Sequence, residues 1–391
     1  MKPRTIIDRV RWMGAEDWDR RLFDSLIPLP DGTSYNSYLV QGSEQTVLID
    51  TVDPTQAEVL LSQLEDVPRL DYVVAHHAEQ DHSGSIPRVL AKYPRAKVVA
   101  SPKCVTMLQD LLLIPPDKFL PVEDGQTLSL GDKTLEFIHT PWVHWPETMC
   151  TFLGQDKLLF SCDFFGSHIA GTDLYAEDEG RVYEAAKRYY AEIMMPFAPV
   201  IRQNLAKVKA RSPRIIAPSH GPIYKRPEFI LEAYEDWISG TPRNVAVIPF
   251  ISMHGSTQVM VDRLVTDLAA RGVAVHQFNL ADTDIGKLAM SLVDAATIVL
   301  GTPTVHAGAH PQVLYAALLA NALRPKAKWA SIIGSFGWHS KAVEQISGLI
   351  PNLKVEVLAP VMAKGFPRQE NFLELERLAR EISERHRTLR P

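Results

Sequence analysis

Residues 72–84 read YVVAHHAEQDHSG, and this stretch decides the fold of the first part of the chain. Its first four residues form an apolar, strand-like run that ends where the polar residues begin. His76, His77, Glu79, Asp81 and His82 then place five ionisable side chains within seven positions. Imidazoles and carboxylates crowded at the end of a strand repel or desolvate one another unless a cation compensates them. The stretch therefore predicts a metal site at the carboxyl edge of a sheet, in preference to a merely polar loop.

Three further ligand-type residues stand after other strand-like runs. His144 lies in PWVHWP (141–146), Asp163 ends FSCD (160–163), and His220 lies in APSHGP (217–222). Each of them alone is better explained by a hydrogen-bonded core residue. Their common position favours one shared site, because ligands of α/β sheets gather at the carboxyl ends of strands. The combined set has four imidazoles and three carboxylates: His77, His82, His144, His220, Glu79, Asp81 and Asp163.

Turn residues divide the chain near SGTP (239–242), after a predicted helix at 227–237. We expect two domains, 1–240 and 241–391. The first mixes strands with helices. Its predicted strands are 37–40, 46–49, 72–75, 97–100, 134–139, 158–161 and 214–217.

The second domain alternates strands and helices regularly, as a doubly wound parallel sheet does. Its predicted strands are 245–251, 273–278, 296–300 and 328–333, and its predicted helices are 256–271 and 311–323. The last stretch, 369–390, is predicted to be a charged amphipathic helix that lies on the solvated surface.

Composition excludes several classes of protein. Lys and Arg number 41 against 46 Asp and Glu, a net charge of −5, so nucleic acid is not expected as a partner. Cys104, Cys150 and Cys162 contain no C-x-x-C pair, which argues against a disulfide framework and against an iron–sulfur cluster of the chain's own. Neither a signal-peptide core nor a run of 18 apolar residues occurs, so we expect a soluble cytoplasmic protein without membrane contact.

The order of the seven ligand-type residues, four of them packed as HxExDH (77–82), resembles the metal-binding pattern of the metallo-β-lactamase superfamily. Zinc hydrolases of that superfamily carry His at the second position, where this chain has Glu79. With PWVHWPETM (141–149), this Glu makes the chain similar to the flavodiiron proteins, or A-type flavoproteins. The resemblance implies an αββα sandwich of the metallo-β-lactamase type in the first domain.

The same resemblance implies a non-haem di-iron centre, and a carboxylate-rich donor set suits iron better than zinc. One iron would be held by His77, Glu79 and His144, the other by Asp81, His82 and His220, with Asp163 as the bridge.

Three further residues are expected near the metals: Asp50, His168 and Tyr190. Asp50 would orient a ligating imidazole. A helix N-cap explains Asp50 nearly as well, and His168 and Tyr190 are explained equally well as structural residues.

The second domain carries an anion-binding loop, SMHGST (252–257), between a predicted strand and a helix. Neither G-x-x-x-x-G-K-[ST] nor G-x-G-x-x-G is present, so a monophosphate fits better than a nucleoside triphosphate or a dinucleotide. A capped helix start explains this loop alone as well. Two further strand-end loops, GTPTVHAG (301–308) and GSFGWHS (334–340), favour the ligand, and all three resemble the flavodoxin pattern for FMN.

By this resemblance the first loop would hold the ribityl phosphate, and the other two would flank the isoalloxazine ring. The expected FMN contacts are Ser252, Met253, His254, Gly255, Ser256, Thr257, Pro303, Thr304, Val305, His306, Ala307, Gly308, Ser335, Phe336, Gly337 and Trp338.

Together, the two resemblances imply an oxidoreductase in which FMN passes electrons to the di-iron site, which reduces dioxygen to water, nitric oxide to nitrous oxide, or both. The expected electron donor is a separate partner, either rubredoxin or a reduced deazaflavin coenzyme. A head-to-tail homodimer, or a dimer of dimers, is implied as well. Two alternatives are a zinc hydrolase with a flavodoxin-like domain and a flavodoxin-like electron carrier with an inactive metal domain.

Overall fold

A computed structural model describes residues 1–389, which divide into two compact units. The first unit contains Met1–Tyr190 and Phe197–Ile238, and the second contains Ala191–Pro196 and the chain from Ser239 onward. Within the described residues, none of the helices combines the length and the hydropathy that a bilayer crossing requires. The last residue of the helix predicted at 369–390 lies outside the described residues.

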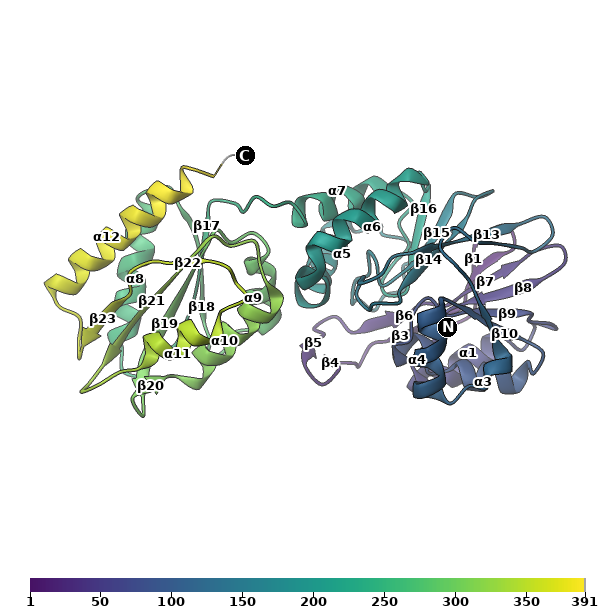
Figure 1. Ribbon diagram of the computed structural model, residues 1–391, viewed down its shortest axis with the longest axis horizontal. Helices are drawn as coiled ribbons and strands as arrows, with labels where there is room; N and C mark the ends of the chain where they lie inside the picture. Colours follow the sequence, from purple (N-terminus) through teal and green to yellow (C-terminus); the bar gives the residue numbers. More distant parts are fainter. Residues whose placement is uncertain (390–391) are drawn as a thin grey trace. The chain divides into compact units, whose positions relative to one another are not determined.

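Two sheets form the centre of the first unit (Figure 1). The first sheet has the order β1 (Arg4–Ile7), β2 (Val10–Trp12), β7 (Tyr38–Gln41), β8 (Thr46–Ile49), β9 (Tyr72–Val74), β10 (Lys97–Ala100) and β11 (Phe119–Pro121). The second has the order β12 (Thr127–Ser129), β13 (Thr134–His139), β14 (Met149–Leu153), β15 (Leu158–Cys162) and β16 (Ile215–Pro218). Two small ribbons pair β3 (Ala15–Asp17) with β6 (Thr33–Tyr35) and β4 (Leu22–Phe23) with β5 (Ile27–Pro28).

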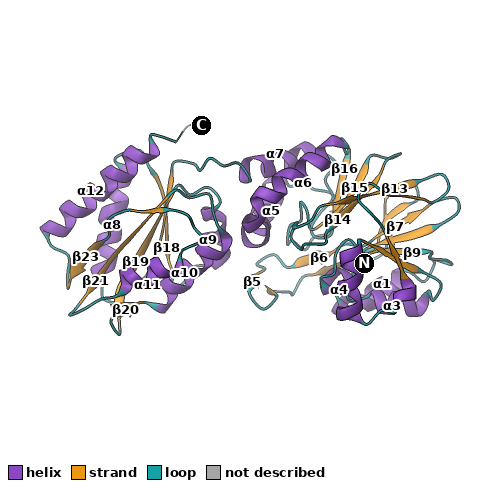
Figure 2. Cartoon of the chain, in the orientation of Figure 1, coloured by secondary structure: helices purple, strands orange, loops and turns teal. Residues whose placement is uncertain are grey.

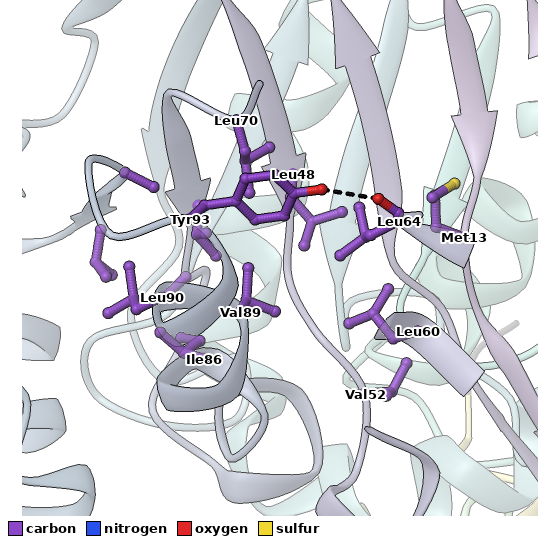
Figure 3. Packing of buried hydrophobic residues seen from close by; sticks show 14 of the residues in the cluster. Met13, Leu48, Val52, Leu60, Leu64, Leu70, Ile86, Val89, Leu90 and Tyr93 are labelled. Atoms are coloured by element: carbon purple, nitrogen blue, oxygen red, sulfur yellow. Dashed lines mark hydrogen bonds between the residues drawn. The ribbon is translucent and has the colours of Figure 1, made fainter. Parts of the chain in front are cut away.

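Strand periodicity explains how the first sheet buries both faces. Alternate residues of a strand point to opposite sides, so Val47 and Ile49 join the core between the two sheets while Leu48 points the other way. Leu48 packs in the outer core beneath helices, where the Tyr93 hydroxyl donates to the Leu64 carbonyl at 2.8 Å (Figure 3). The helices of this outer layer are α1 (Ala57–Gln63), α3 (Ile86–Lys92) and α4 (Pro102–Leu112).

Helices also lie over the second sheet (Figure 1). They are α5 (Glu179–Tyr189), α6 (Ala198–Ala210) and α7 (Pro227–Trp237). Directly after α6, Arg211 forms an ion pair with Glu136 of β13 at 2.6 Å. Short turns of 3₁₀ or π type occupy Pro54–Gln56, Pro116–Lys118, Tyr190–Met194 and Met195–Phe197. The αββα sandwich predicted from the resemblance is confirmed.

The second unit contains a sheet with five parallel strands along its main path. Their order is β18 (Ala274–Asn279), β17 (Val245–Phe250), β19 (Thr297–Val305), β21 (Trp329–Phe336) and β22 (Glu356–Val357). β23 (Val361–Lys364) also pairs with β21 in parallel, further along that strand than β22 does. β20 (Gly308–Ala309) pairs with the end of β19. This is the 2-1-3-4-5 order of flavodoxin-like sheets, so the predicted doubly wound class is confirmed.

Helices cover both faces of this sheet (Figure 2). α8 (Ser256–Ala269) and α12 (Gln369–His386) pack together on one face. The other helices are α9 (Ile285–Leu292), α10 (Pro311–Leu323) and α11 (Ala342–Leu349). The prediction of a merely solvated last helix is wrong, because Leu375, Leu378 and Ile382 of α12 are fully buried against the core.

Candidate functional site

All seven predicted metal ligands come from positions that follow strands of the first unit. His77 and Glu79 lie in the loop after β9, and Asp81 and His82 lie in the short helix α2 (Gln80–Ser83) that the same loop enters. The other three lie in the loops after β13, β15 and β16: His144, Asp163 and His220. Because a sheet fixes where its strands end, segments far apart in the sequence meet at one edge.

The first group of donor atoms contains His77, Glu79, His144 and Asp163, whose ligand atoms lie within 4.8 Å of one another. Asp163 Oδ2 is 2.9 Å from His77 Nε2 and 3.3 Å from His144 Nε2. Glu79 Oε2 is 3.1 Å from His144 Nε2. These distances place four potential ligands around one point.

The second group contains Asp81, His82 and His220. Asp81 Oδ2 lies 3.2 Å from both His82 Nε2 and His220 Nε2. Asp163 reaches this group with its other oxygen, because Oδ1 is 3.0 Å from His82 Nε2. One carboxylate therefore faces both groups, as a bridge between two metal ions would.

Burial and charge distinguish this cluster from a polar surface loop. Asp163 and His82 are each 1% exposed. Burial alone would lower the pKa of His82, but the carboxylates of Asp81 and Asp163 outweigh it and raise that pKa to about 10. Burial alone would raise the pKa of the Asp163 carboxyl, but His82 and His77 hold that pKa well below its usual range. Without a metal, protons must supply the positive charge that compensates these carboxylates.

The hydrogen-bonding state of the donor atoms fits a metal site. Within residues 1–389, buried atoms without a hydrogen-bond partner include His77 Nε2, both carboxylate oxygens of Asp81, and Asp163 Oδ2. Buried polar atoms normally find partners, so several orphans pointing into one cluster are what ligand atoms require. The mixture of imidazole and carboxylate is of the type that suits non-haem iron.

Asp50 supports the cluster through a residue that sequence reasoning did not select. Its Oδ2 lies 2.7 Å from His76 Nδ1, and its Oδ1 accepts the His76 backbone N–H at 2.9 Å. Ser219 donates its hydroxyl to the same carboxylate at 3.2 Å. Asp50 therefore holds the neighbours of His77 and His220, and the N-cap of the following turn is Asp53 instead.

The two other predicted supporting residues have different surroundings. The ring of His168 lies 4.7 Å from that of His220, and its Nδ1 is 2.9 Å from the Thr33 hydroxyl. The Tyr190 hydroxyl instead donates to the Trp237 carbonyl at 3.3 Å. Its neighbour Tyr189 packs against the cluster, with its ring 4.8 Å from that of His168. Consecutive helical residues point about 100° apart, and the sequence carries no signal that selects one of the two tyrosines.

A cavity of about 610 Å³ reaches the carboxylates of Glu79 and Asp81. Its wall also includes Arg20, Asp24 and Trp145. The cavity gives a small molecule access to the cluster. Sequence reasoning missed these wall residues because no spacing pattern ties the 20–24 segment to the strand-end motifs.

In the second unit, the three predicted loops converge on one pocket at the ends of β17, β19 and β21. The pocket lies where the strand order reverses between β17 and β19, the usual ligand position in such sheets. The predicted residues that line it are Ser252, Met253, His254, Ser256, Thr257, Pro303, Thr304, Ser335, Phe336 and Gly337. Gly365, which follows β23, also lines it and was not predicted.

The other predicted flavin contacts are not part of this wall: Gly255, Val305, His306, Ala307, Gly308 and Trp338. His306 and Ala307 form the two-residue turn between β19 and β20, both with positive φ. A Cβ at Gly308 would lie 2.5 Å from the Gln345 side chain, so this glycine allows close packing against α11. Trp338 is 83% exposed beside the pocket.

Comparisons with known proteins show the same architecture. A sequence profile described as "ODP family beta lactamase" matches residues 33–221. The chain is 33% identical to a nitric oxide reductase of Moorella thermoacetica, with 98% of this chain and 99% of the relative covered. It is similar to the structure of a rubredoxin oxygen:oxidoreductase from the anaerobe Desulfovibrio gigas, with TM-score 0.95, 28% identity and 99% of both chains covered. It is also similar to the flavodiiron protein from Giardia intestinalis, with TM-score 0.91, 27% identity, and 100% of this chain and 98% of that chain covered.

Proposed function

The chain belongs to the flavodiiron family, and on this premise we propose that it is an oxidoreductase with FMN and a di-iron centre. Electrons would pass from FMN to iron, which reduces dioxygen to water, nitric oxide to nitrous oxide, or both. The single observation that carries the proposal is the position of Asp163, whose two oxygens face two separate groups of ligands. One carboxylate shared in this way is what a dinuclear site needs.

We assign the ligands by these two groups. His77, Glu79 and His144 would hold one iron, Asp81, His82 and His220 the other, and Asp163 would bridge them. When bound, the two irons supply redox chemistry at a site that can hold a small diatomic substrate. The chain's own contribution is to fix the donors and to admit substrate through the cavity beside Glu79 and Asp81.

The region 1–240 would then be the di-iron domain, and 241–391 the FMN domain. Support for the flavin comes from the pocket between the three loops, where the α8 N-terminus and the hydroxyls of Ser252, Ser256 and Thr257 suit a phosphate group. Phe336 supplies an apolar surface in the same pocket. Among the described residues, no lysine or arginine lines this pocket, so backbone N–H groups and hydroxyls would bind the phosphate.

A separate redox partner is part of this proposal. The three cysteines, Cys104, Cys150 and Cys162, are all buried and free, so they offer no cluster for incoming electrons. Rubredoxin and a reduced deazaflavin coenzyme are the two candidate donors, and a structural relative is named for rubredoxin. Free thiols suit a reducing compartment, which favours the cytoplasm.

A head-to-tail homodimer, or a dimer of dimers, also belongs to the proposal. Met253, which lines the flavin pocket, is 51% exposed, and Trp338 beside it is 83% exposed. Apolar side chains that gather at the mouth of a site are typical of a contact surface. Sedimentation of the FMN-loaded protein would measure the oligomeric state.

The test is Asp163→Ala, compared with Asp110→Ala on the exposed side of α4, in protein loaded with FMN and iron. Iron content is measured first, and the reduced protein is then mixed anaerobically with dioxygen or nitric oxide, with rubredoxin and the deazaflavin as donors. We expect Asp163→Ala to keep FMN and lose turnover, while Asp110→Ala keeps both. Full activity of Asp163→Ala would refute the assignment. Two zinc ions per wild-type chain would favour a hydrolase, and flavin reduction without gas consumption would favour an electron carrier.

A further inference from the structure

The two groups of iron ligands differ in what lies behind their imidazoles. His77 turns Nε2 toward Asp163 at 2.9 Å, and its Nδ1 lies 3.9 Å from Glu147 Oε1. His220 turns Nε2 toward Asp81 at 3.2 Å, and its Nδ1 lies 2.7 Å from the Ser34 backbone carbonyl. A carboxylate therefore stands behind the first imidazole and a neutral carbonyl behind the second.

Glu147 is held firmly in this position. Its side chain is fully buried, and Oε1 accepts the backbone N–H of Ala78, the residue after His77, at 3.0 Å. Its own backbone carbonyl accepts the Ser101 hydroxyl at 2.8 Å. The loop that carries Glu147 also carries His144, so one segment fixes two residues of the same ligand group.

The charge of Glu147 is not explained by hydrogen bonding alone. Among the described residues, its Oε2 has no hydrogen-bond partner, and Oε1 has only the Ala78 N–H. A buried carboxylate is costly unless an opposite charge compensates it. His77 is the ionisable group that lies within ion-pair distance of it. An acceptor for Ala78 alone needs no charge, because a glutamine would serve equally well.

We propose that Glu147 is a positioning residue for His77 and makes the His77–Glu79–His144 iron more electron-rich than the Asp81–His82–His220 iron. The carboxylate is too far from Nδ1 for a hydrogen bond, but a negative charge 3.9 Å away, with both side chains fully buried, favours positive charge on the imidazole and so increases electron donation to the iron. A more basic ligand stabilises the higher oxidation state, so this iron loses its electron first when the reduced pair is oxidised. This inference rests on the proposed di-iron centre.

The test is Glu147→Gln in the full chain loaded with FMN and iron. Glutamine keeps the shape and an acceptor for Ala78 but removes the charge. The reduced protein is titrated with ferricyanide, which takes one electron at a time, while electron paramagnetic resonance follows the half-oxidised iron pair. We expect the first oxidation to shift to higher potential, the two one-electron steps to move closer, and the maximum half-oxidised signal to fall. Retention of iron against a chelator should also weaken, by about 10- to 100-fold.

Two further variants separate a charge effect from a folding effect. Glu147→Asp keeps the charge and should restore part of the separation between the two steps. Glu123→Gln makes the same chemical change at an exposed position and should titrate as the wild type does. If Glu147→Gln fails to fold, Glu147→Asp decides: a reduced separation, expected because the shorter side chain moves the charge away from His77, supports the charge effect, and an unchanged separation overturns it.

The outcomes distinguish this inference from the function on which it rests. A wild-type separation of the two steps in folded Glu147→Gln overturns the role of Glu147 and leaves the di-iron centre intact. A wild-type protein that binds no iron pair and gives no half-oxidised signal overturns the proposed function itself.

Discussion

Replacing Asp50 tests whether a buried, hydrogen-bonded carboxylate outside the ligand set holds the metal site together. Its carboxylate is 2% exposed and receives three contacts: the His76 ring at 2.7 Å, the His76 backbone N–H at 2.9 Å and the Ser219 hydroxyl at 3.2 Å. These contacts tie the end of β8 to the residues that precede the ligands His77 and His220. Loss of the carboxylate should therefore affect both stability and iron binding.

The size of the effect follows from the burial of these contacts. Asp50→Ala removes the buried acceptor of the His76 ring, the His76 backbone N–H and the Ser219 hydroxyl, and each buried donor left without a partner costs about 1–3 kcal/mol. Asp50→Asn keeps one acceptor but turns an NH₂ group toward a donor, which should cost about 1–3 kcal/mol. Asn also tolerates the positive φ of 53° at this position, whereas Ala adds strain.

The assay is urea unfolding of the iron-free chain, followed by tryptophan fluorescence, with iron affinity measured separately. Asp50→Ala should lower the free energy of unfolding of the first unit more than Asp50→Asn does, and both should weaken iron binding. Asp110→Ala, on the exposed side of α4, is the control and should stay within about 0.5 kcal/mol of the wild type. A loss below about 1 kcal/mol in Asp50→Ala would show that these contacts contribute little, contrary to the cost expected for buried donors left without an acceptor.

Two further predictions concern the second unit. Burial lowers the pKa of His386, whose Nε2 lies 2.7 Å from the Thr297 hydroxyl, from 6.5 to about 4. Between pH 6.5 and 4 the unfolded chain therefore binds a proton at this histidine that the folded chain does not, so the free energy of unfolding should fall by about 1–2 kcal/mol over this range, after allowance for solvent screening. Urea titrations at several pH values should show a flatter dependence for His386→Gln. An unchanged slope in this variant would contradict the prediction. A Cβ at Gly334 would lie 2.0 Å from the Thr302 carbonyl oxygen on the neighbouring strand, so Gly334→Ala should cost about 1–3 kcal/mol and weaken FMN binding in fluorescence titrations. The control Gly348→Ala enters open space and should leave FMN binding unchanged, while the free energy of unfolding should rise by up to about 1 kcal/mol because Ala replaces Gly within α11. Equal losses in the two variants would refute the steric argument.

Strand pattern and strand-end position carried most of the correct prediction. The strands at 46–49, 97–100 and 134–139 and the helix at 227–237 have the predicted bounds. The sequence was informative there because each apolar run is flanked by turn residues and buried on both faces or on one regular face. The convergence of His144, Asp163 and His220 followed from a general property of sheets rather than from any one motif.

The parts that were missed have physical reasons in common. Strands β2 to β6 contain only two or three residues each, too few for periodicity to show. Thr33 and Ser34 are polar yet buried, and Ser34 holds His220 through a backbone carbonyl that any residue would supply. In α12 the i, i+3, i+7 spacing of Leu375, Leu378 and Ile382 marks an apolar face, but the many charged residues around it favoured a solvated surface helix over one buried against the core.

Sheet architecture explains how so many ionisable groups can be buried in one place. The strand before His77 and Glu79, β9, is hydrogen-bonded on both sides, to β8 and to β10. In the second unit β19 is likewise bonded to β17 and β21. Ligand loops that start from such strands begin in a fixed backbone, so little further conformational entropy is lost when their side chains are ordered.

This arrangement also separates two kinds of variant. Truncating a ligand at a strand end removes one donor from an edge that the sheet still holds, so chemistry should fail while the fold persists. Truncating Leu48 within β8 removes packing that both neighbouring strands and the outer helices share, which costs about 2–5 kcal/mol. The ligands would then be lost with the fold. The proposed site is therefore best tested at strand ends, where loss of activity in a folded protein reports on the metal centre alone.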